Sequence, residues 1–398
     1  MILKKAFTKI LSAFLAILLL CVGTVQICAQ TDPVLSGEGV TSEKESSSLS
    51  LPCASAILMD AKTGTVIYEQ NADTALPPAS VTKVMTLLLV MEAIEAGKIR
   101  LDDMVTVSAN AASMGGSQVY LKEGETMSVE EMLKCVVIAS ANDCAVALAE
   151  LVAGSEEEFV VAMNRRAAEL QMLNTHFENT NGLDDTATNH VTSARDIAIM
   201  SRELISHPKI LEYSGIWMDT IRDGAFGLTN TNRLVRFYPG CTGLKTGSTS
   251  KAKFCISATA ERDGLSLICV IMAAETRDTR NASAAKLLDY GFANYASYRC
   301  DAGESVVCVQ GGVQPECQVR YDEFCALIPK GMGANVEKEI VLPDVLTAPL
   351  SAGDEVGKVV FKLNGAEIGS VPIRATASVD KIGFGTLFCR LLAQFLLM

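Results

Sequence analysis

The stretch PPASVTK, residues 77 to 83, places Ser80 three residues before Lys83. A serine hydroxyl is a poor nucleophile until a base removes its proton, and a lysine amine can act as that base when burial or a neighbouring cation lowers its pKa. The same spacing occurs at three other places, which are Ser248 with Lys251, Ser250 with Lys253 and Ser283 with Lys286. The pair alone is therefore weak evidence for catalysis, since a helix start and a surface lysine explain it more simply.

Two further polar clusters follow along the chain. The triplet SAN at residues 140 to 142 offers a second hydroxyl and an amide, and the triplet KTG at residues 245 to 247 offers a cation, a hydroxyl and a glycine. A peptide carboxylate needs a fixed counter-charge, and a glycine in a strand lets another backbone approach closely. Three clusters of complementary chemistry in this order are hard to attribute to chance.

The residues around the first cluster predict a helix. Pro77 and Pro78 suit an extended approach to a helix start, and the run VTKVMTLLLVMEAIEAG predicts a buried helix that ends at Gly97. Ser80 is then expected at or just before the first turn, with Lys83 on the same face. The backbone N–H groups of a helix N-terminus would favour negative charge that develops near Ser80.

The second cluster is predicted in a loop between helices and the third in a strand. A capping box at Ser128 and Glu131 predicts a helix that runs to about Ile138. The run ASANDCAVALAELVAG predicts the next helix, which Asn142 could also cap. The KTG triplet begins a long stretch of strand composition whose turn is at Asp263-Gly264.

The order of the elements predicts the fold class. A strand pair in ASAILMDAKTGTVIYEQN precedes the first cluster, a run of helices follows it, and strands and a further helix, ASAAKLLDYGFANYASY, come after. This order predicts an α/β (α+β) domain in which an antiparallel sheet packs against helices, without internal repeats.

The remaining segments predict an exported protein with a second domain. Residues 1–30 have a basic start and an apolar run too short for a comfortable membrane span, which predicts a signal peptide, with a retained anchor as the alternative. Residues 31–52 form a polar, serine-rich leader, and residues 53–298 the domain that carries the three clusters. Short alternating strands predict a small all-β domain over residues 299–378.

The last segment, residues 379–398, predicts an amphipathic helix. Its apolar face comprises Ile382, Phe384, Leu387, Phe388, Leu391, Leu392 and Phe395. A helix of this length and pattern is expected to lie in a membrane interface, although it could instead be a core helix of the β domain.

Composition excludes several classes of function. The 398-residue chain has a net charge of -12 and no basic stripe, so we expect no nucleic-acid partner. Three histidines and no C-x-x-C leave little material for a metal site, and we expect no cofactor. Four cysteines in apolar runs are expected to be free and buried, and four in the β region could pair: Cys135, Cys144, Cys255 and Cys269, and Cys300, Cys308, Cys317 and Cys325.

With S-x-x-K, S-x-N and K-T-G in this order, the chain resembles the penicillin-recognising serine enzymes. The stretches ILMDAKTGTVIYEQNAD, PPASVTKVMT, NTNGLDDTATNHVTSARDIAIM and GLKTGSTS resemble in particular the secreted D-alanyl-D-alanine carboxypeptidases, the low-molecular-mass penicillin-binding proteins of peptidase family S11. The resemblance covers residues 53 to 398 and implies a transpeptidase-like domain with a five-stranded antiparallel sheet, followed by a small β domain and an amphipathic helix. It also implies peptidoglycan stem peptides ending in D-Ala-D-Ala as substrate, β-lactam antibiotics as covalent inhibitors, and a place at the outer face of the cytoplasmic membrane.

The resemblance implies roles for the catalytic residues. Ser80 attacks the carbonyl between the two D-alanines, and Lys83 takes its proton while Lys245 acts as the neighbouring cation. Ser140 relays a proton to the departing D-alanine, and Asn142 positions the substrate amide and Lys83.

The same resemblance implies a substrate-binding strand. Lys245 and Thr246 hold the terminal carboxylate, Gly247 allows close approach, and the backbone N–H groups of Ser80 and Ser248 form the oxyanion hole. His190 is expected to order its loop rather than to take part in the chemistry.

One position departs from the family pattern, and rival functions remain. Lys253 in Ala252-Lys253-Phe254 stands where the family usually has a small residue, which puts the acceptor preference in doubt. A class A β-lactamase needs a glutamate in E-x-x-L-N, but before Leu173-Asn174 the required position is Leu170 and Glu169 misses it by one residue. A non-catalytic peptidoglycan-binding scaffold is the second rival, and transfer to an amine acceptor would use the same acyl-enzyme.

Overall fold

A computed structural model of the chain describes residues 49–185 and 187–396, so the predicted signal peptide and most of the leader lie outside the described residues. The first part of the structure is a five-stranded antiparallel sheet in the order β2-β1-β9-β8-β7. Its strands are β1 (Ser55–Asp60), β2 (Val66–Gln70), β7 (Cys241–Thr249), β8 (Lys253–Arg262) and β9 (Leu265–Ala274). The predicted α/β class and antiparallel sheet are confirmed.

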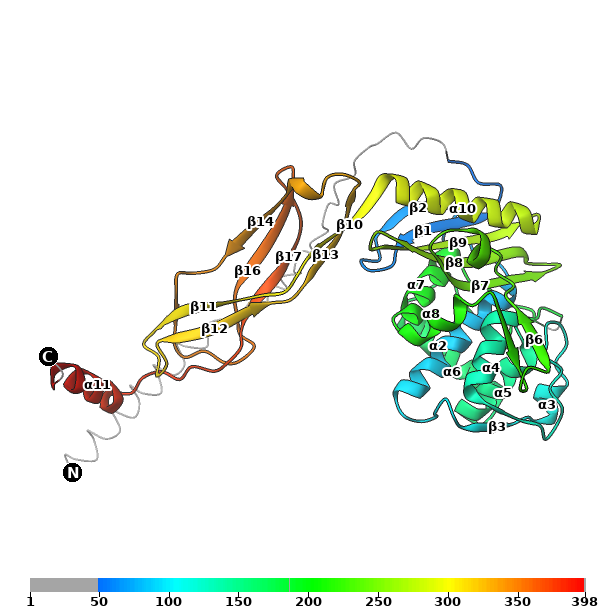
Figure 1. Ribbon diagram of the computed structural model, residues 1–398, viewed down its shortest axis with the longest axis horizontal. Helices are drawn as coiled ribbons and strands as arrows, with labels where there is room; N and C mark the ends of the chain where they lie inside the picture. Colours follow the sequence, from blue (N-terminus) through cyan, green and yellow to red (C-terminus); the bar gives the residue numbers. More distant parts are fainter. Residues whose placement is uncertain (1–48, 186, 397–398) are drawn as a thin grey trace, which may run out of the picture. The chain divides into compact units, whose positions relative to one another are not determined.

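Helices cover both faces of this sheet. Helix α10 (Arg277–Asn294) packs on β8 and β9 from one side, and α7 (Ala194–Ile205) packs on β1, β8 and β9 from the other (Figure 1). Strands covered on both faces must be apolar on both, which explains the nearly continuous apolar runs in β1 and β9. The other helices are α2 (Lys83–Glu95), α3 (Ala109–Ala112), α4 (Val129–Lys134), α5 (Asn142–Ala153), α6 (Glu156–Glu169), α8 (Pro208–Ser214) and α9 (Leu234–Phe237).

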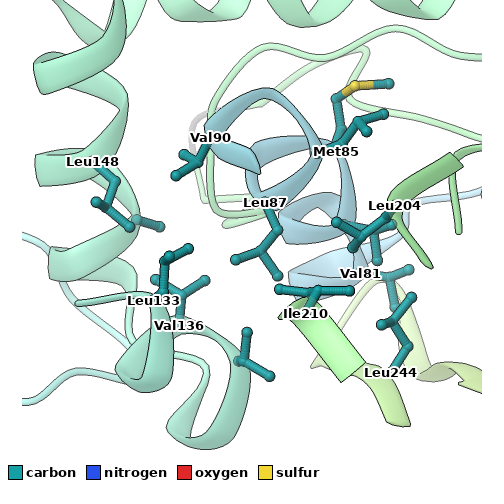
Figure 2. Close-up of a cluster of buried hydrophobic side chains, with 14 of the residues drawn as sticks. Val81, Met85, Leu87, Val90, Leu133, Val136, Leu148, Leu204, Ile210 and Leu244 are labelled. Atoms are coloured by element: carbon teal, nitrogen blue, oxygen red, sulfur yellow. The ribbon is translucent and has the colours of Figure 1, made fainter. Parts of the chain in front are cut away.

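The core of the first part lies between the sheet and these helices. Figure 2 shows part of this cluster, in which side chains from α2, α4, α5, α7 and α8 meet. Val81 and Leu244 belong to the same cluster and are 0% and 3% exposed. Because they are the chain neighbours of Ser80 and Lys245, burial of these two apolar side chains holds the two polar clusters in place.

The second part is the predicted all-β domain. A six-stranded sheet has the order β14-β16-β17-β12-β11-β15, and β10 pairs with β13 in a separate ladder. Its strands are β10 (Tyr295–Cys300), β11 (Gly303–Gln310), β12 (Glu316–Tyr321), β13 (Phe324–Pro329), β14 (Val336–Val341), β15 (Val345–Thr347), β16 (Glu355–Leu363) and β17 (Ala366–Ala375). Phe324 and Phe361 stack at 4.0 Å between ring centroids in its core.

Some boundaries differ from those expected. Helix α10 begins at Arg277, and its last turn runs directly into β10 at Tyr295, where the sequence suggested a continuing helix. The two tyrosines of this segment favour strand, and pairing with β13 decides the outcome. The structure also adds two short antiparallel strand pairs and a 3₁₀ turn. The pairs are β3 (Met104–Thr106) with β4 (Thr126–Ser128) and β5 (Met218–Ile221) with β6 (Phe226–Thr229), and the turn is η3 (Gly333–Asn335).

The C-terminal helix, α11 (Phe384–Leu396), keeps its apolar face in solvent. Phe384 is 84% exposed and Phe388 is 55% exposed, so this helix is not a core helix of the β domain. In the described part of the chain no helix combines the length and apolarity needed to cross a bilayer.

The cysteines that the structure describes are free thiols. Cys135, Cys144, Cys255 and Cys269 are buried, as the apolar runs predicted. The four cysteines of the β domain, which the spacing left open for pairing, form no disulfide with one another.

Candidate active site

Ser80 lies in a tight turn that precedes α2. The turn is the 3₁₀ segment η1 (Ala79–Thr82), and Ala79 has a positive φ of 49°. An alanine pays about 1–2 kcal/mol for this left-handed conformation, so the surroundings must enforce it. Gly182 contributes, because a Cβ at its position would stand 1.9 Å from the carbonyl oxygen of Ala79.

His190 supports the same turn from behind. Its Nδ1 accepts a hydrogen bond from the Glu178 N–H at 3.0 Å, so Nε2 carries the proton and donates to Oγ1 of Thr82 at 2.7 Å. The Thr82 hydroxyl in turn donates to the Ala79 carbonyl at 2.8 Å. Burial lowers the pKa of His190 to about 4, which keeps the ring neutral. These bonds support the expectation that His190 orders the loop.

Lys83 begins α2 and is completely buried beneath Ser80. Its Nζ lies 3.0 Å from Oγ of Ser80, 2.6 Å from Oδ1 of Asn142 and 2.8 Å from the carbonyl oxygen of Asn181. Burial, and then the charge of Lys245, lower the pKa of Lys83 well below its ordinary value. The first two predicted clusters therefore meet at this amine.

Ser140 and Asn142 reach the site through an irregular break between α4 and α5. After α4 the chain makes a π-helical turn, η2 (Cys135–Ala139), and Ser140 adopts a left-handed conformation with φ 64°. Such turns are common at functional sites. The side chain of Asn142 does not cap α5, contrary to one expectation, because its amide donates to the Gly115 carbonyl at 2.7 Å and its oxygen faces Lys83.

The third cluster lies on β7, the edge strand of the sheet. Lys245 is 1% exposed, and its Nζ lies 2.9 Å from Oγ of Ser140. Burial, and then the charge of Arg280, lower the pKa of Lys245 to about 7. The Thr246 hydroxyl donates to Oγ1 of Thr231 at 2.8 Å.

Gly247 marks the closest approach of β7 to the nucleophile turn. A Cβ at this position would lie 2.7 Å from the carbonyl oxygen of Pro78 and 2.8 Å from the backbone nitrogen of Ser80. Real Cβ contacts are essentially never this short, so only glycine lets the strand pass beside the turn. Alternation along the strand puts Lys245 on the same face as Gly247.

These residues surround a cavity of about 560 Å³. The sequence predicted five of its lining residues, which are Ser80, Ser140, Thr246, Gly247 and Ser248. Three predicted residues are not in the lining but contact it or one another. Lys83 contacts Ser80, and Lys245 contacts Ser140. Asn142 contacts Lys83. Lys253 is not among the lining residues and pairs with Glu275 at 2.5 Å, so its charge is countered outside the cavity.

Other residues that the motifs did not indicate also line the cavity. These are Ser117, Trp217, Thr229, Asn230, Thr231, Arg233, Phe237, Arg277 and Arg280. Arg277 and Arg280 stand in the first turn of α10, where the helix dipole disfavours cations. Two arginines at this unfavourable position could have been recognised in the sequence as candidate binding residues. The backbone carbonyl of Asn181, which contacts Lys83, could not have been predicted from any side-chain pattern.

Comparison with known proteins identifies the family to which the sequence is similar. Residues 41–276 match the family of D-alanyl-D-alanine carboxypeptidases, peptidase S11, and residues 319–381 match the C-terminal domain of penicillin-binding protein 5. The D-alanyl-D-alanine carboxypeptidase DacF of Bacillus subtilis is 42% identical over 360 residues, which cover 88% of this chain and 92% of the relative.

Solved structures agree. Penicillin-binding protein 5 from Haemophilus influenzae has a TM-score of 0.73 at 31% identity and covers 83% of this chain and 98% of its own. Penicillin-binding protein D2 from Listeria monocytogenes, in its cefotaxime-bound form, has a TM-score of 0.57 at 33% identity. The match covers 61% of this chain and 98% of the Listeria chain. The chain therefore belongs to the D-alanyl-D-alanine carboxypeptidases of peptidase family S11 and is a serine-type enzyme of that family.

Proposed function

We propose that the chain removes the terminal D-alanine from peptidoglycan stem pentapeptides through an acyl-enzyme on Ser80, with Lys83 as the base. The observation that carries this assignment is the set of three contacts around Nζ of Lys83. A neutral amine has two N–H groups and one lone pair. Asn142 Oδ1 and the Asn181 carbonyl can only accept, so they take both N–H groups, and the lone pair is left for the Ser80 hydroxyl.

The second lysine supports the division of roles. Two buried ammonium groups this close repel each other, so one of them is favoured as the neutral base and the other as the cation. Burial, and then the charge of Lys245, lower the pKa of Lys83, which suits the base, and Lys245, with a pKa of about 7, is the cation for the terminal carboxylate together with Thr246. Arg280 lines the same cavity and adds a cation that the sequence motifs did not include.

Acylation then proceeds with a closed proton balance. Ser80 Oγ bonds to the carbonyl carbon of the penultimate D-alanine, and its proton passes to Lys83. The backbone N–H groups of Ser80 and Ser248 stabilise the oxyanion. When the C–N bond breaks, Ser140 protonates the departing amine and takes a proton from Lys245, the group with which its hydroxyl is in contact.

Deacylation reverses this order. Water attacks the ester carbonyl and gives its proton through Ser140 back to Lys245. The ester bond breaks, and Lys83 returns its proton to Ser80 Oγ. Among residues 49–185 and 187–396, those that line the cavity include no aspartate or glutamate, which disfavours the glutamate-assisted deacylation of class A β-lactamases.

The direct test is D-alanine release from diacetyl-L-Lys-D-Ala-D-Ala by the full-length protein in detergent. We expect release by the native enzyme and none by Ser80→Ala, with both proteins equally folded. Labelling of Ser80 by penicillin without release of D-alanine would contradict the hydrolase assignment and favour transfer to an amine acceptor. Rapid hydrolysis of a chromogenic cephalosporin would instead favour a serine β-lactamase. Failure of penicillin to label a folded sample would favour a non-catalytic peptidoglycan-binding scaffold.

We also propose that the enzyme is exported and that α11 holds it at the outer face of the cytoplasmic membrane. The family acts on the cell wall, and the apolar side chains of α11 are exposed on one face, which suits insertion into a lipid interface. Co-sedimentation with anionic vesicles tests this proposal. Phe388→Asp on the apolar face should abolish binding, whereas Thr386→Asp on the opposite face should reduce it much less; equal binding by both variants would contradict it.

A further inference from the structure

One wall of the cavity, defined by Arg233, Arg277 and Arg280, is unusually cationic for this protein. The chain carries 46 acidic against 34 basic residues, yet the described residues that line the cavity include three arginines and no carboxylate. Arg233 precedes α9, and Arg277 and Arg280 lie in the first turn of α10, so two separate elements contribute to the same wall. Arg280 is buried and donates to the Cys255 carbonyl of β8 and to Oδ1 of Asn281, so it has a structural role that the two exposed arginines do not share.

The two outer arginines lack the partners that other arginines have. Arg195 pairs with Glu69 and Asp73, and Arg222 pairs with Glu125. Within residues 49–185 and 187–396, Arg233 and Arg277 form no ion pair and no side-chain hydrogen bond. Both are exposed, so their guanidinium groups are available to a ligand in the cavity.

The positions of these arginines are electrostatically unfavourable. Arg277 and Arg280 both sit at the positive end of an 18-residue helix. Burial, and then the charge of Arg277 with a smaller contribution from Arg233, lower the pKa of Arg280 to about 10. The three cations therefore repel one another, and an anion that binds between them would relieve this repulsion.

We propose that Arg233 and Arg277 form a subsite for a second carboxylate of the substrate, in addition to the terminal one. Arg280 is 3% exposed and lies on the Lys245 side, where it supports the terminal carboxylate, so the outer pair remains for another anionic group. Guanidinium groups bind carboxylates in a bidentate manner, which suits stem peptides that keep a free acid on the residue before D-Ala-D-Ala or on the D-glutamyl residue further up the stem.

This inference rests on the proposed function, and its test separates the two. Three D-Ala-D-Ala peptides are compared with the full-length enzyme: the neutral diacetyl-L-Lys tripeptide, a peptide with meso-diaminopimelate before D-Ala-D-Ala, and a peptide with γ-linked D-glutamate before lysine. Each acidic peptide has a twin in which the extra carboxylate is an amide. We expect kcat/KM for at least one acid to exceed that of its twin by about fivefold to tenfold, falling as salt rises.

The variants Arg233→Gln and Arg277→Gln should remove this preference while the neutral peptide is cleaved at nearly the native rate. Lysine at both positions should restore part of it, because the charge returns without the bidentate geometry. Lys286→Gln, an exposed position on α10 outside the cavity, removes the same charge and should change nothing.

The outcomes are distinct. Equal kcat/KM for every acid and its amide overturns the anion subsite, and so does a preference that survives the double glutamine variant. Failure of the native enzyme to cleave any peptide, the neutral one included, overturns the proposed function instead.

Discussion

Nζ of Lys245 lies 2.9 Å from Oγ of Ser140, so the second lysine of the site contacts the second serine. Lys83 contacts Ser80 at 3.0 Å in the same way. Each serine therefore has its own lysine, and both lysines are buried with lowered pKa values. This pairing separates the groups that we propose for removing the nucleophile's proton and for protonating the leaving amine.

The pairing predicts a bell-shaped pH dependence. Lys83 must be neutral to accept a proton, and Lys245 must be protonated to bind the carboxylate, so kcat/KM should fall above the Lys245 pKa of about 7. The bound carboxylate favours the charged ammonium, so the same limb should lie at higher pH in kcat. Steady-state kinetics from pH 5 to 10 check this; a kcat/KM profile that is flat through the alkaline range would contradict it.

Arg280→Gln should move that alkaline limb. The guanidinium contributes to the lowered pKa of Lys245, so its removal should raise this pKa and shift the kcat/KM limb to higher pH. The variant should also weaken binding of the terminal carboxylate and raise KM. A higher KM with an unmoved limb would show that Arg280 binds substrate without tuning Lys245.

Gly247→Ala should block acylation. The new Cβ would lie 2.8 Å from the backbone nitrogen of Ser80, so strand and turn must separate and one oxyanion donor must move. Loss of one such donor typically costs about 100- to 1,000-fold in rate. Stopped-flow labelling with a fluorescent penicillin measures the effect. Gly227→Ala, whose Cβ meets no atom within 4 Å, is the control and should acylate normally.

Asp143→Asn should lower both stability and the pKa of Lys83. The buried carboxylate accepts hydrogen bonds from the N–H groups of Val119, Leu121 and Cys144, and an amide can accept at only one of its two atoms. We expect a loss of about 1–3 kcal/mol in urea unfolding. The charge of Asp143 also favours protonated Lys83, so the acid limb of acylation should move to lower pH; an upward shift would be inconsistent with this arrangement.

His190 should make the fold sensitive to acid. Its pKa is about 4 in the folded protein and about 6.5 in the unfolded chain, so the unfolded state binds more protons between these values. The contribution of neutral His190 to the free energy of unfolding is therefore fully present above pH 6.5. It decreases as the pH falls through 4, by on the order of 3 kcal/mol. His190→Gln should remove this slope in urea titrations, whereas His176→Gln, at an exposed position, should retain it.

The sequence alone predicted those parts of the site in which a catalytic motif lies in a segment of recognisable secondary structure. The S-x-x-K, S-x-N and K-T-G triplets lie in short segments whose caps, glycines and apolar runs predicted a helix start, an interhelical break and a strand. These features are local, so they could be read without knowing the contacts. The sheet class and the exposed amphipathic face of α11 follow from periodicity in the same way.

Only the tertiary structure determined which residues the three motifs contact. Which lysine serves which serine depends on packing between residues up to 105 positions apart, as in the bond from Lys245 to Ser140. The third ligand of Lys83 is a backbone carbonyl at Asn181, which no side-chain pattern reports. Arg233 and Arg277 join one wall only because α9 and α10 meet at the same cavity. Such long-range contacts set the pKa values and charges of the site, because burial and proximity are properties of the folded chain.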